Sequence, residues 1–235
     1  MKAMILAAGL GTRLRPVTEK IPKALVKVNG RTLLETAILH LRESGIREII
    51  LNVHHLAGQI IDFLGENGNF GVQLAISDET GLLLDTGGGL KKAEWFFRDG
   101  NPFVVRNVDV LSDMDLGKMV EFHREKKALV TLAVRDRETS RYFLFNRQTR
   151  LLCGWENRDT GEQIHAGPGD PGPVRLAFSG IQVVDPAIFP LITEEGRFSL
   201  TPVYLRLARE QRIIGYEDNR SAWQDAGKSL KDIDA

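Results

Sequence analysis

Short apolar runs alternate with amphipathic segments along the first half of the chain, and this alternation limits the possible folds more than any other feature. Runs rich in β-branched and apolar residues predict four buried strands, over residues 2–8, 48–53, 72–77 and 102–110. Between them, apolar side chains at helical spacing predict helices over residues 32–44 and 56–64, and a third that follows a glycine turn at 86–89 and reaches Trp95. Strands and helices in this order are typical of βα units, so we expect a doubly wound α/β fold with a largely parallel sheet.

The second half of the chain has a different pattern, which predicts antiparallel strands. After a helix that ends near Lys127, three strand-like runs at 128–136, 141–146 and 150–157 are close enough in sequence to be antiparallel neighbours. Residues 157–173 are dense in Gly, Pro and Asp and predict a mobile loop without regular structure. The remaining predictions are a strand at 175–184, a helix near 200–210, a strand at 212–216 and a short final helix. Because no composition shift marks a boundary, we expect one domain over residues 1–235, with a small antiparallel sheet in its second half.

The composition excludes several classes of partner. Lys and Arg together number 31, as do Asp and Glu, so no net field attracts nucleic acid or an anionic membrane surface. No apolar run reaches the roughly 20 residues of a membrane helix, and the N-terminus lacks the apolar region of a signal peptide. Cys153 is the only cysteine and lies in a strand-like run, which favours a core position. We therefore expect a soluble cytoplasmic protein without nucleic-acid or membrane partners.

A glycine-rich loop, AGLGTRLRP at residues 8–16, follows the first predicted strand directly. Glycine lets main-chain N–H groups approach a ligand closely, so the loop predicts an anion site. It lacks the Gly-Lys-Ser/Thr of a P-loop and the third glycine of a dinucleotide-binding fingerprint. Arg13 and Lys23 instead add fixed positive charge, which suits a triphosphate whose charge increases as pyrophosphate leaves.

The pattern Gly-x-Gly-Thr-Arg-Leu-Arg-Pro, with Pro-Lys-Ala-Leu at residues 22–25, resembles the signature of the sugar-1-phosphate nucleotidyltransferases, also called NDP-sugar pyrophosphorylases. The resemblance extends over the whole chain and implies their Rossmann-like, three-layer α/β/α mixed sheet, the nucleotide-diphospho-sugar transferase fold. It implies that a nucleoside triphosphate and a sugar 1-phosphate react with Mg²⁺ to give a nucleotide-activated sugar and pyrophosphate. Residues 1–115 would form the nucleotide-binding half and residues 116–235 the sugar-phosphate-binding half.

By this resemblance, two glycine-rich segments hold the nucleotide. In the opening loop, the base and ribose would lie along Leu6, Ala7, Ala8 and Gly9, and the phosphates along Gly11, Thr12 and Arg13. Lys23 would contact the α-phosphate and, with Arg13, would supply the catalytic positive charge. The base edge would face Thr86, Gly87 and Gly88, although the three leucines at 82–84 stand where the family more often has Pro-Leu. No general base is expected, because the attacking sugar phosphate is already an anion.

Two aspartates, far apart in the sequence, are the Mg²⁺ ligands that the resemblance implies. Asp109 closes the run Asn107-Val108-Asp109, where Val108 replaces the family's glycine, and Asp225 lies in the family's late Asp-x-Gly pattern. Two carboxylates suit Mg²⁺, which takes few protein ligands and completes its shell with water or phosphate. Asp113 and Asp115 precede a predicted helix and are expected to cap it.

The sugar phosphate is expected mainly in the second half. The resemblance points to Asn107, Glu156, Arg158, Ser179 and Gly180. Many family members follow the glutamate with Lys-Pro, and this lysine holds the sugar phosphate, whereas this chain continues with Asn157 and Arg158. Arg158 or Arg141 would take the place of the lysine.

Other functions fit part of the pattern. Asn107-Val108-Asp109 resembles a degenerate Asp-x-Asp motif of glycosyltransferases with a related fold, although these enzymes need no basic pyrophosphate site. A cytidylyltransferase with a phosphocholine-type acceptor and a non-catalytic nucleotide or sugar sensor also stay open. The short chain is most similar to small family members that act on N-acetylmuramic acid, mannose or heptose 1-phosphate. Uridine is the favoured base with guanine close behind, and we expect a monomer or small homo-oligomer.

Overall fold

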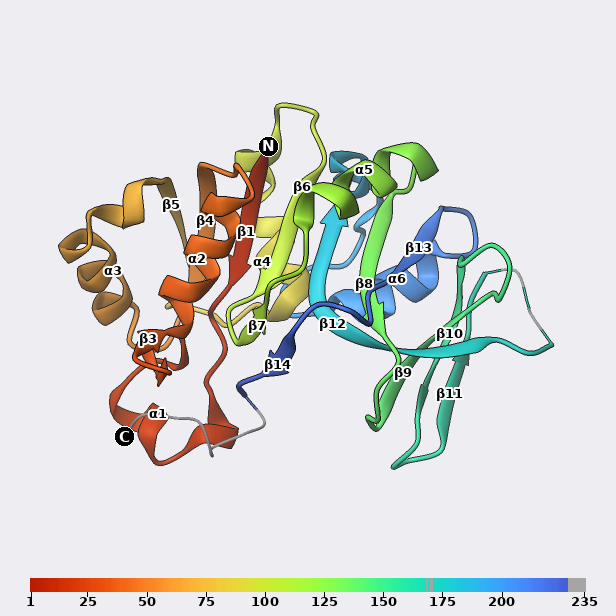
Figure 1. The fold of residues 1–235 in the computed structure, drawn as a ribbon, viewed down its shortest axis with the longest axis horizontal. Coiled ribbons are helices and arrows are strands. Elements are labelled where there is room, and N and C mark those ends of the chain that lie inside the picture. The colour runs from red at the N-terminus through yellow and green to blue at the C-terminus, as the bar shows by residue number, and fades with distance from the viewer. Residues whose placement is uncertain (168, 170, 228–235) are drawn as a thin grey trace.

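The computed structural model describes residues 1–167, 169 and 171–227, which form a mixed sheet with helices on both faces (Figure 1). Within these residues the sheet has ten strands. Eight of them lie in the order β11 (Glu162–His165), β10 (Leu152–Asn157), β9 (Arg141–Phe145), β12 (Val174–Val184), β6 (Phe103–Asn107), β1 (Lys2–Leu6), β4 (Glu48–Val53) and β5 (Gln73–Asp78). The other two are β8 (Val130–Arg135), which pairs with β12, and β13 (Ile213–Glu217), which pairs with β8.

The strands β6, β1, β4 and β5 are parallel, as the alternation of strands and helices predicts. Successive residues of β1 face opposite sides of the sheet, so Ala3 and Ile5 belong to one hydrophobic core and Met4 to another. The first core includes residues of α2 (Leu33–Glu43), α3 (Ala57–Glu66) and α5 (Leu116–Lys126), and the second includes residues of α4 (Asp85–Lys92) and α6 (Leu200–Leu207). Figure 1 shows α2, α3 and α5 on the near face of the sheet and α4 and α6 behind it. The predicted three-layer α/β/α arrangement is confirmed.

Side-chain caps begin two of these helices, as the sequence predicts. Thr32 Oγ1 accepts a hydrogen bond from the N–H of Glu35 at 3.0 Å before α2, and Asp115 Oδ1 accepts one from Lys118 at 3.0 Å in α5. Each cap satisfies a main-chain donor that the first helical turn leaves without a partner. Asp113 makes no cap, because its carboxylate accepts a hydrogen bond from a main-chain N–H distant in sequence, at 2.8 Å.

The second half adds antiparallel strands, and β12 joins them to the parallel strands. Both β9–β10 and β10–β11 are antiparallel pairs. One long strand, β12, pairs with β9 through Val174–Leu176 and with β6 through Ile181–Val184. The predicted antiparallel strands are therefore present, but β8 is not a neighbour of β9. It pairs instead with β12 and β13. This is possible because β12 is long: its first residues pair with β9, and its residues from Ala177 to Val184 pair with β8.

The loop predicted at 157–173 was wrong in part, since β11 lies inside it. Residues 157–161 form a tight turn in which Gly161 has φ +73° and its N–H donates to the carbonyl of Asn157 at 2.8 Å. This turn reverses the chain, so that four exposed residues can pair with β10.

Two other predicted elements have different boundaries. Residues 86–89 form part of the first turns of α4 rather than a separate turn, and the helix ends at Lys92, before the 3₁₀ helix η4 (Glu94–Phe97). The strand predicted at 102–110 divides into β6 and β7 (Val110–Ser112), and β7 pairs with β14 (Trp223–Asp225) in a separate small sheet. The short helix predicted after the strand at 212–216 is absent from residues 217–227, which contain β14, and the remaining residues 228–235 lie outside the described part of the chain.

Several short elements complete the fold: η1 (Thr12–Leu14), α1 (Val17–Lys20), η2 (Lys23–Leu25), β2 (Lys27–Val28), β3 (Arg31–Thr32), η3 (Gly68–Gly71) and η5 (Pro186–Leu191). In the part of the chain that the structure describes, no helix is long and apolar enough to cross a lipid bilayer. Cys153 is buried in β10, as predicted.

Candidate active site

The opening loop leaves the end of β1 and is held tightly at Gly11. This residue has φ +63°, and its carbonyl accepts hydrogen bonds from Leu14 N and Thr18 Oγ1, both at 2.8 Å. A Cβ at Gly11 would lie 2.8 Å from Thr18 Cγ2 and 3.1 Å from Lys23 Cβ. Glycine is therefore required both by the backbone angle and by the close approach of the loop to Lys23.

The predicted nucleotide-binding residues of this loop differ in exposure. Ala7 and Ala8 are buried at the end of β1, whereas Gly9, Thr12 and Arg13 are exposed. Among the described residues, no hydrogen bond or ion pair involves the Arg13 side chain. A guanidinium in this state is available to an anion that approaches from solvent.

Lys23, Asp109 and Asp225 meet beside the opening loop, and we call them the carboxylate cluster. Lys23 Nζ contacts Asp109 Oδ2, and these side chains are only 12% and 14% exposed. The position that a Cβ would take on Gly227 lies 2.6 Å from Lys23 Nζ, 2.7 Å from Asp109 Oδ2 and 3.0 Å from Asp225 Oδ1. The main chain fixes the arrangement, because Ala226 N donates to the carbonyl of Asp109 at 3.0 Å. The structure thus brings together Lys23, which was predicted to supply positive charge, and Asp109 and Asp225, which were predicted to bind the metal.

The cluster offers two carboxylates, a smaller donor set than a structural zinc site has. No group of three or more His, Cys, Asp or Glu side chains with metal-site geometry occurs among the described residues. Structural zinc sites need such a set of four, whereas Mg²⁺ uses one or two carboxylates together with water or phosphate oxygens. Glycine at position 227 allows this close approach, because a Cβ there would lie within 3.0 Å of all three side chains.

Arg106, which the sequence analysis did not identify, is buried behind the cluster. Its guanidinium donates to His40 Nδ1 at 2.8 Å and to the carbonyl of Val110. Burial lowers the pKa of Arg106 to about 10, and the negative charge of Asp109 opposes this shift. Burial, followed by the charge of Arg106, lowers the pKa of His40. The neutral histidine can therefore accept a hydrogen bond from Arg106. The hydrogen bond from Arg106 to the carbonyl of Val110 supports the turn that carries Asp109.

The second glycine-rich segment packs against residues 196–200. The N–H groups of Gly87 and Gly88 both donate to the carbonyl of Phe198, at 2.9 and 3.2 Å, and Thr86 Oγ1 accepts from Leu200 N at 3.0 Å. A Cβ on Gly87 would lie 2.4 Å from the Phe198 ring. These two N–H groups are therefore hydrogen-bonded within the protein and are not directed at a base edge, as was expected. The reason is that the glycines, which have no side chains, let the backbone at Phe198 approach.

A buried polar pair connects the two glycine-rich segments. Asn52 Oδ1 accepts from Ala7 N at 2.7 Å, and Asn52 Nδ2 donates to Glu79 Oε1 at 2.8 Å. The other carboxylate oxygen of Glu79 accepts from Leu84 N at 3.0 Å, just before α4. Asn52 and Glu79 are 2% and 1% exposed, so the connection lies in the protein interior. Neither residue belongs to a motif, and the sequence analysis missed both.

Three of the predicted sugar-phosphate residues lie close to β7 and β14. Gly180 has φ +76°, and a Cβ there would lie 2.5 Å from Val110 Cγ2 and 3.2 Å from Asn107 Nδ2. The carbonyl of Ser179 accepts a hydrogen bond from Trp223 Nε1 at 2.8 Å. Trp223 belongs to the strand that carries Asp225, so Asn107, Ser179 and Gly180 are connected to the carboxylate cluster.

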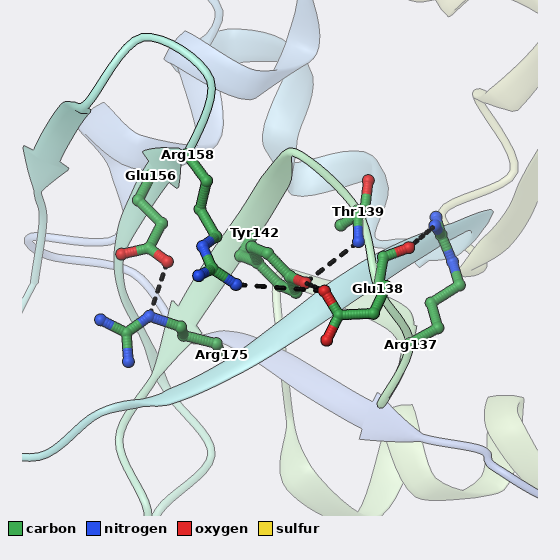
Figure 2. Close-up of polar contacts among 7 residues, drawn as sticks. All are labelled: Arg137, Glu138, Thr139, Tyr142, Glu156, Arg158 and Arg175. Atoms are coloured by element: carbon green, nitrogen blue, oxygen red, sulfur yellow. Dashed lines mark hydrogen bonds and ion pairs between the residues drawn. The ribbon is translucent and has the colours of Figure 1, made fainter.

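Glu156 and Arg158, by contrast, line a separate polar pocket of about 420 Å³. Figure 2 shows their side chains with the partners Arg175 and Glu138. Its lining residues are Glu156, Asn157, Arg158, Gly161, Gln163 and Arg175. Glu156 is buried and accepts from Arg175 Nε at 2.6 Å, a partner that the sequence analysis missed. Arg158 is 4.0 Å from Glu138 Oε2, and its side chain is 61% exposed. Arg141 is exposed at the start of β9, and no residue of the carboxylate cluster lines this pocket.

Comparison with known proteins identifies the family. The family model described as Nucleotidyl transferase matches residues 2–150. A UTP–glucose-1-phosphate uridylyltransferase from Synechocystis is 43% identical over 56% of this chain, but the matched part spans only 36% of that relative. An N-acetylmuramate alpha-1-phosphate uridylyltransferase from Neisseria meningitidis is 31% identical over 97% of this chain and 93% of its own length. A mannose-1-phosphate guanyltransferase from Yarrowia lipolytica is 28% identical over 97% of this chain and 61% of its own length.

Solved structures share the fold. A putative glucose-1-phosphate thymidylyltransferase from Bacillus anthracis, in complex with a sucrose, has a TM-score of 0.79 and 24% identity, over 98% of this chain and 91% of that one. The nucleotide-diphospho-sugar transferase fold predicted from the resemblance is therefore confirmed. The chain belongs to the nucleotidyl transferase family, and the two relatives described above that match 97% of it are a sugar-1-phosphate uridylyltransferase and a guanyltransferase.

Proposed function

We propose that this chain transfers a nucleotidyl group from a nucleoside triphosphate to a sugar 1-phosphate and releases pyrophosphate. The observation that carries the proposal is the meeting of Lys23, Asp109 and Asp225 within 3.0 Å of one point, beside the opening loop. Relatives that match nearly the whole chain are sugar-1-phosphate nucleotidyltransferases, and this does not favour the glycosyltransferase alternative. The continuous sheet, in which β12 pairs with both β6 and β9, supports a single domain.

In the proposed complex the triphosphate lies along the opening loop, with its base and ribose over Leu6 to Gly9. Gly11 and Thr12 offer main-chain N–H groups to the phosphates, and Arg13 supplies a positive charge that has no partner among the described residues. The start of α4 lies beside the base. Its residues Thr86, Gly87 and Gly88 hold the helix in place through hydrogen bonds with Phe198 and Leu200, and these bonds use the groups that were expected to contact the base.

The carboxylate cluster fits a divalent cation, which nucleotidyltransferases of this family generally use. We propose that Asp109 and Asp225 hold Mg²⁺ beside Gly227, where glycine lets the two carboxylates lie close to the main chain and to each other. When bound, the ion would neutralise charge on the phosphates and orient them for displacement. The buried guanidinium of Arg106 is within electrostatic range of Asp109, whose negative charge opposes the lowering of the Arg106 pKa by burial.

The proposed reaction is a direct displacement. An oxygen of the sugar 1-phosphate forms a bond to the α-phosphorus, and the bond from that phosphorus to the bridging oxygen of pyrophosphate breaks. The leaving pyrophosphate takes the electron pair, and Arg13 and Lys23 stabilise its increased charge. The chain needs no general base, because the attacking oxygen carries no proton at neutral pH. Its main task is to align the two substrates.

The sugar is proposed to lie between the carboxylate cluster and the Glu156 pocket. Asn107, Ser179 and Gly180 are placed for the end of the sugar near the phosphate, and the buried carboxylate of Glu156 can accept hydrogen bonds from hydroxyl groups. Relatives of both kinds match 97% of the chain, but the uridylyltransferase is matched over 93% of its own length and the guanyltransferase over 61%. Uridine is therefore the proposed base, with guanine as the second choice.

The test is pyrophosphate release with Mg²⁺ for ATP, CTP, GTP, UTP and dTTP. Each is paired with the 1-phosphates of glucose, mannose, N-acetylmuramic acid, N-acetylglucosamine, galactose and heptose, and CTP also with phosphocholine. We expect one productive pair that Asp109→Asn abolishes, while Asp62→Asn on the exposed face of α3 retains it. A folded protein that releases no pyrophosphate with any pair would refute the proposed function.

A further inference from the structure

The family's lysine for the sugar phosphate has no counterpart after Glu156, and the structure does not support Arg158 in its place. Figure 2 shows the Arg158 guanidinium directed at Glu138, with Arg137 on the other side of that glutamate. At 61% exposure and in a pocket without any residue of the carboxylate cluster, Arg158 is a solvated surface group.

Arg137, in the segment after β8, is held much more firmly. Its Cζ lies 4.3 Å from the centroid of the Trp223 ring, which is a cation–π contact. Its Nη2 donates to the carbonyl of Phe178 at 3.1 Å, and Nη1 donates to the carbonyl of Glu138 at 3.4 Å. The side chain is partly exposed, but Nε is buried and has no acceptor among the described residues. A buried donor without an acceptor is costly, and an anion oxygen would satisfy it if the partly exposed guanidinium turned to admit one.

The position of Arg137 is set by the strand that carries a predicted metal ligand. Trp223 and Asp225 are two residues apart in β14, so their side chains point to the same face of that strand. The guanidinium that covers Trp223 therefore lies on the side from which Asp225 enters the carboxylate cluster. Burial lowers the pKa of Arg137 and the negative charge of Asp225 opposes this shift, which places the two groups within electrostatic range.

We propose that Arg137 binds the phosphate of the sugar 1-phosphate and so replaces the lysine that other family members carry after the glutamate. This inference rests on the proposed function. Guanidinium N–H groups pair with two phosphate oxygens at once, and Nε is the group that still lacks a partner. On this assignment Arg13 and Lys23 hold the nucleoside triphosphate, and Arg137 holds the attacking phosphate on the opposite side of the cluster.

The test separates charge from packing with two substitutions. Arg137→Met retains an aliphatic stem over Trp223 but removes the charge, and Arg137→Lys retains the charge. With the productive substrate pair, we expect kcat/KM for the sugar 1-phosphate to fall at least about tenfold in Arg137→Met, with partial recovery in Arg137→Lys. KM for the nucleoside triphosphate should stay within about threefold, and Arg98→Met, at an exposed position, should match the wild type. If the role of Arg137 were purely structural, Arg137→Met would weaken the binding of both substrates and lower the thermal stability together.

Results of three kinds would overturn the inference: an Arg137→Met enzyme with wild-type kcat/KM, equal losses for both substrates, or a larger loss in Arg158→Met. A binding measurement keeps the inference apart from the proposed function. Inorganic phosphate, titrated by calorimetry, should bind the wild type and bind Arg137→Met at least about tenfold more weakly. An inactive wild type would refute the proposed function alone, whereas absent or equal phosphate binding would refute the role of Arg137.

Discussion

Asn52 donates a hydrogen bond to Glu79 at 2.8 Å in the interior, and through this contact the end of β1 is joined to the start of α4. The pair satisfies two main-chain N–H groups, those of Ala7 and Leu84, that lie beside the proposed nucleotide site. A carboxylate that is 1% exposed is stable there only because its oxygens are hydrogen-bonded. The two glycine-rich segments, distant in sequence, therefore depend on one buried contact.

Removing either partner should destabilise the protein. Asn52→Ala removes the partners of Ala7 N and of Glu79 Oε1, so we expect the free energy of unfolding to fall by about 1–3 kcal/mol. Glu79→Gln brings a second amide donor to a site that needs only acceptors and should cost a similar amount. Urea unfolding measures both, with Gln148→Ala at an exposed turn as the control. Additive losses in the double variant would show that the pair is not coupled.

Removing a charged residue of the proposed site should lower turnover sharply. Arg13→Ala or Asp109→Ala should lower kcat about a hundredfold or more, the scale of losing one preorganised charge partner. Arg13 is exposed and its loss should leave the thermal midpoint nearly unchanged. Steady-state pyrophosphate release and a thermal melt of each variant make the comparison. Near-normal turnover in both variants would show that the site is misplaced.

Gly227 should be essential although it has no side chain. A Cβ there would lie 2.6 Å from Lys23 Nζ and 2.7 Å from Asp109 Oδ2, so both side chains would have to move away from it. We expect Gly227→Ala to raise the Mg²⁺ concentration needed for half-maximal activity at least about tenfold, because the two carboxylates must separate. Gly58→Ala in α3 is the matched control, since a Cβ there meets nothing within 4 Å. An unchanged Mg²⁺ requirement in Gly227→Ala would contradict the cation site.

The parallel half of the fold could be predicted because its signals are local. The β-branched runs became β1, β4, β5 and β6, and Thr32 and Asp115 cap the helices that follow them in sequence. The strand β11 could not be predicted, because four exposed residues carry no apolar alternation and the turn at Gly161 resembles any glycine-rich loop. Pairing with β10 stabilises the strand, and that contact is not visible in the segment itself.

The site divides in the same way. Lys23, Asp109 and Asp225 each lie in a recognisable motif, and the structure brings them together. Asn52 and Arg137 belong to no motif, because their roles come from burial and from contacts with segments distant in sequence. Arg106 did offer a signal, as an arginine in an otherwise apolar strand, where a charge is expected only if the interior supplies partners for it.

Acid should destabilise the protein through His123, which is buried on α5. Its Nδ1 lies 2.9 Å from Thr131 Oγ1. Burial lowers the pKa of His123 to about 4, and Asp185 only partly opposes that shift. The unfolded chain takes up a proton near pH 6.5, whereas the folded protein takes it up only near pH 4. The stabilising contribution is therefore complete above pH 6.5 and is lost progressively as the pH falls toward 4.

His123→Gln stays neutral and can still form a hydrogen bond with Thr131. Between pH 7.5 and 5 the variant should therefore lose about 2 kcal/mol less of its free energy of unfolding than the wild type does. Urea unfolding at the two pH values decides this, and equal losses in both proteins would show that His123 is protonated in the folded state.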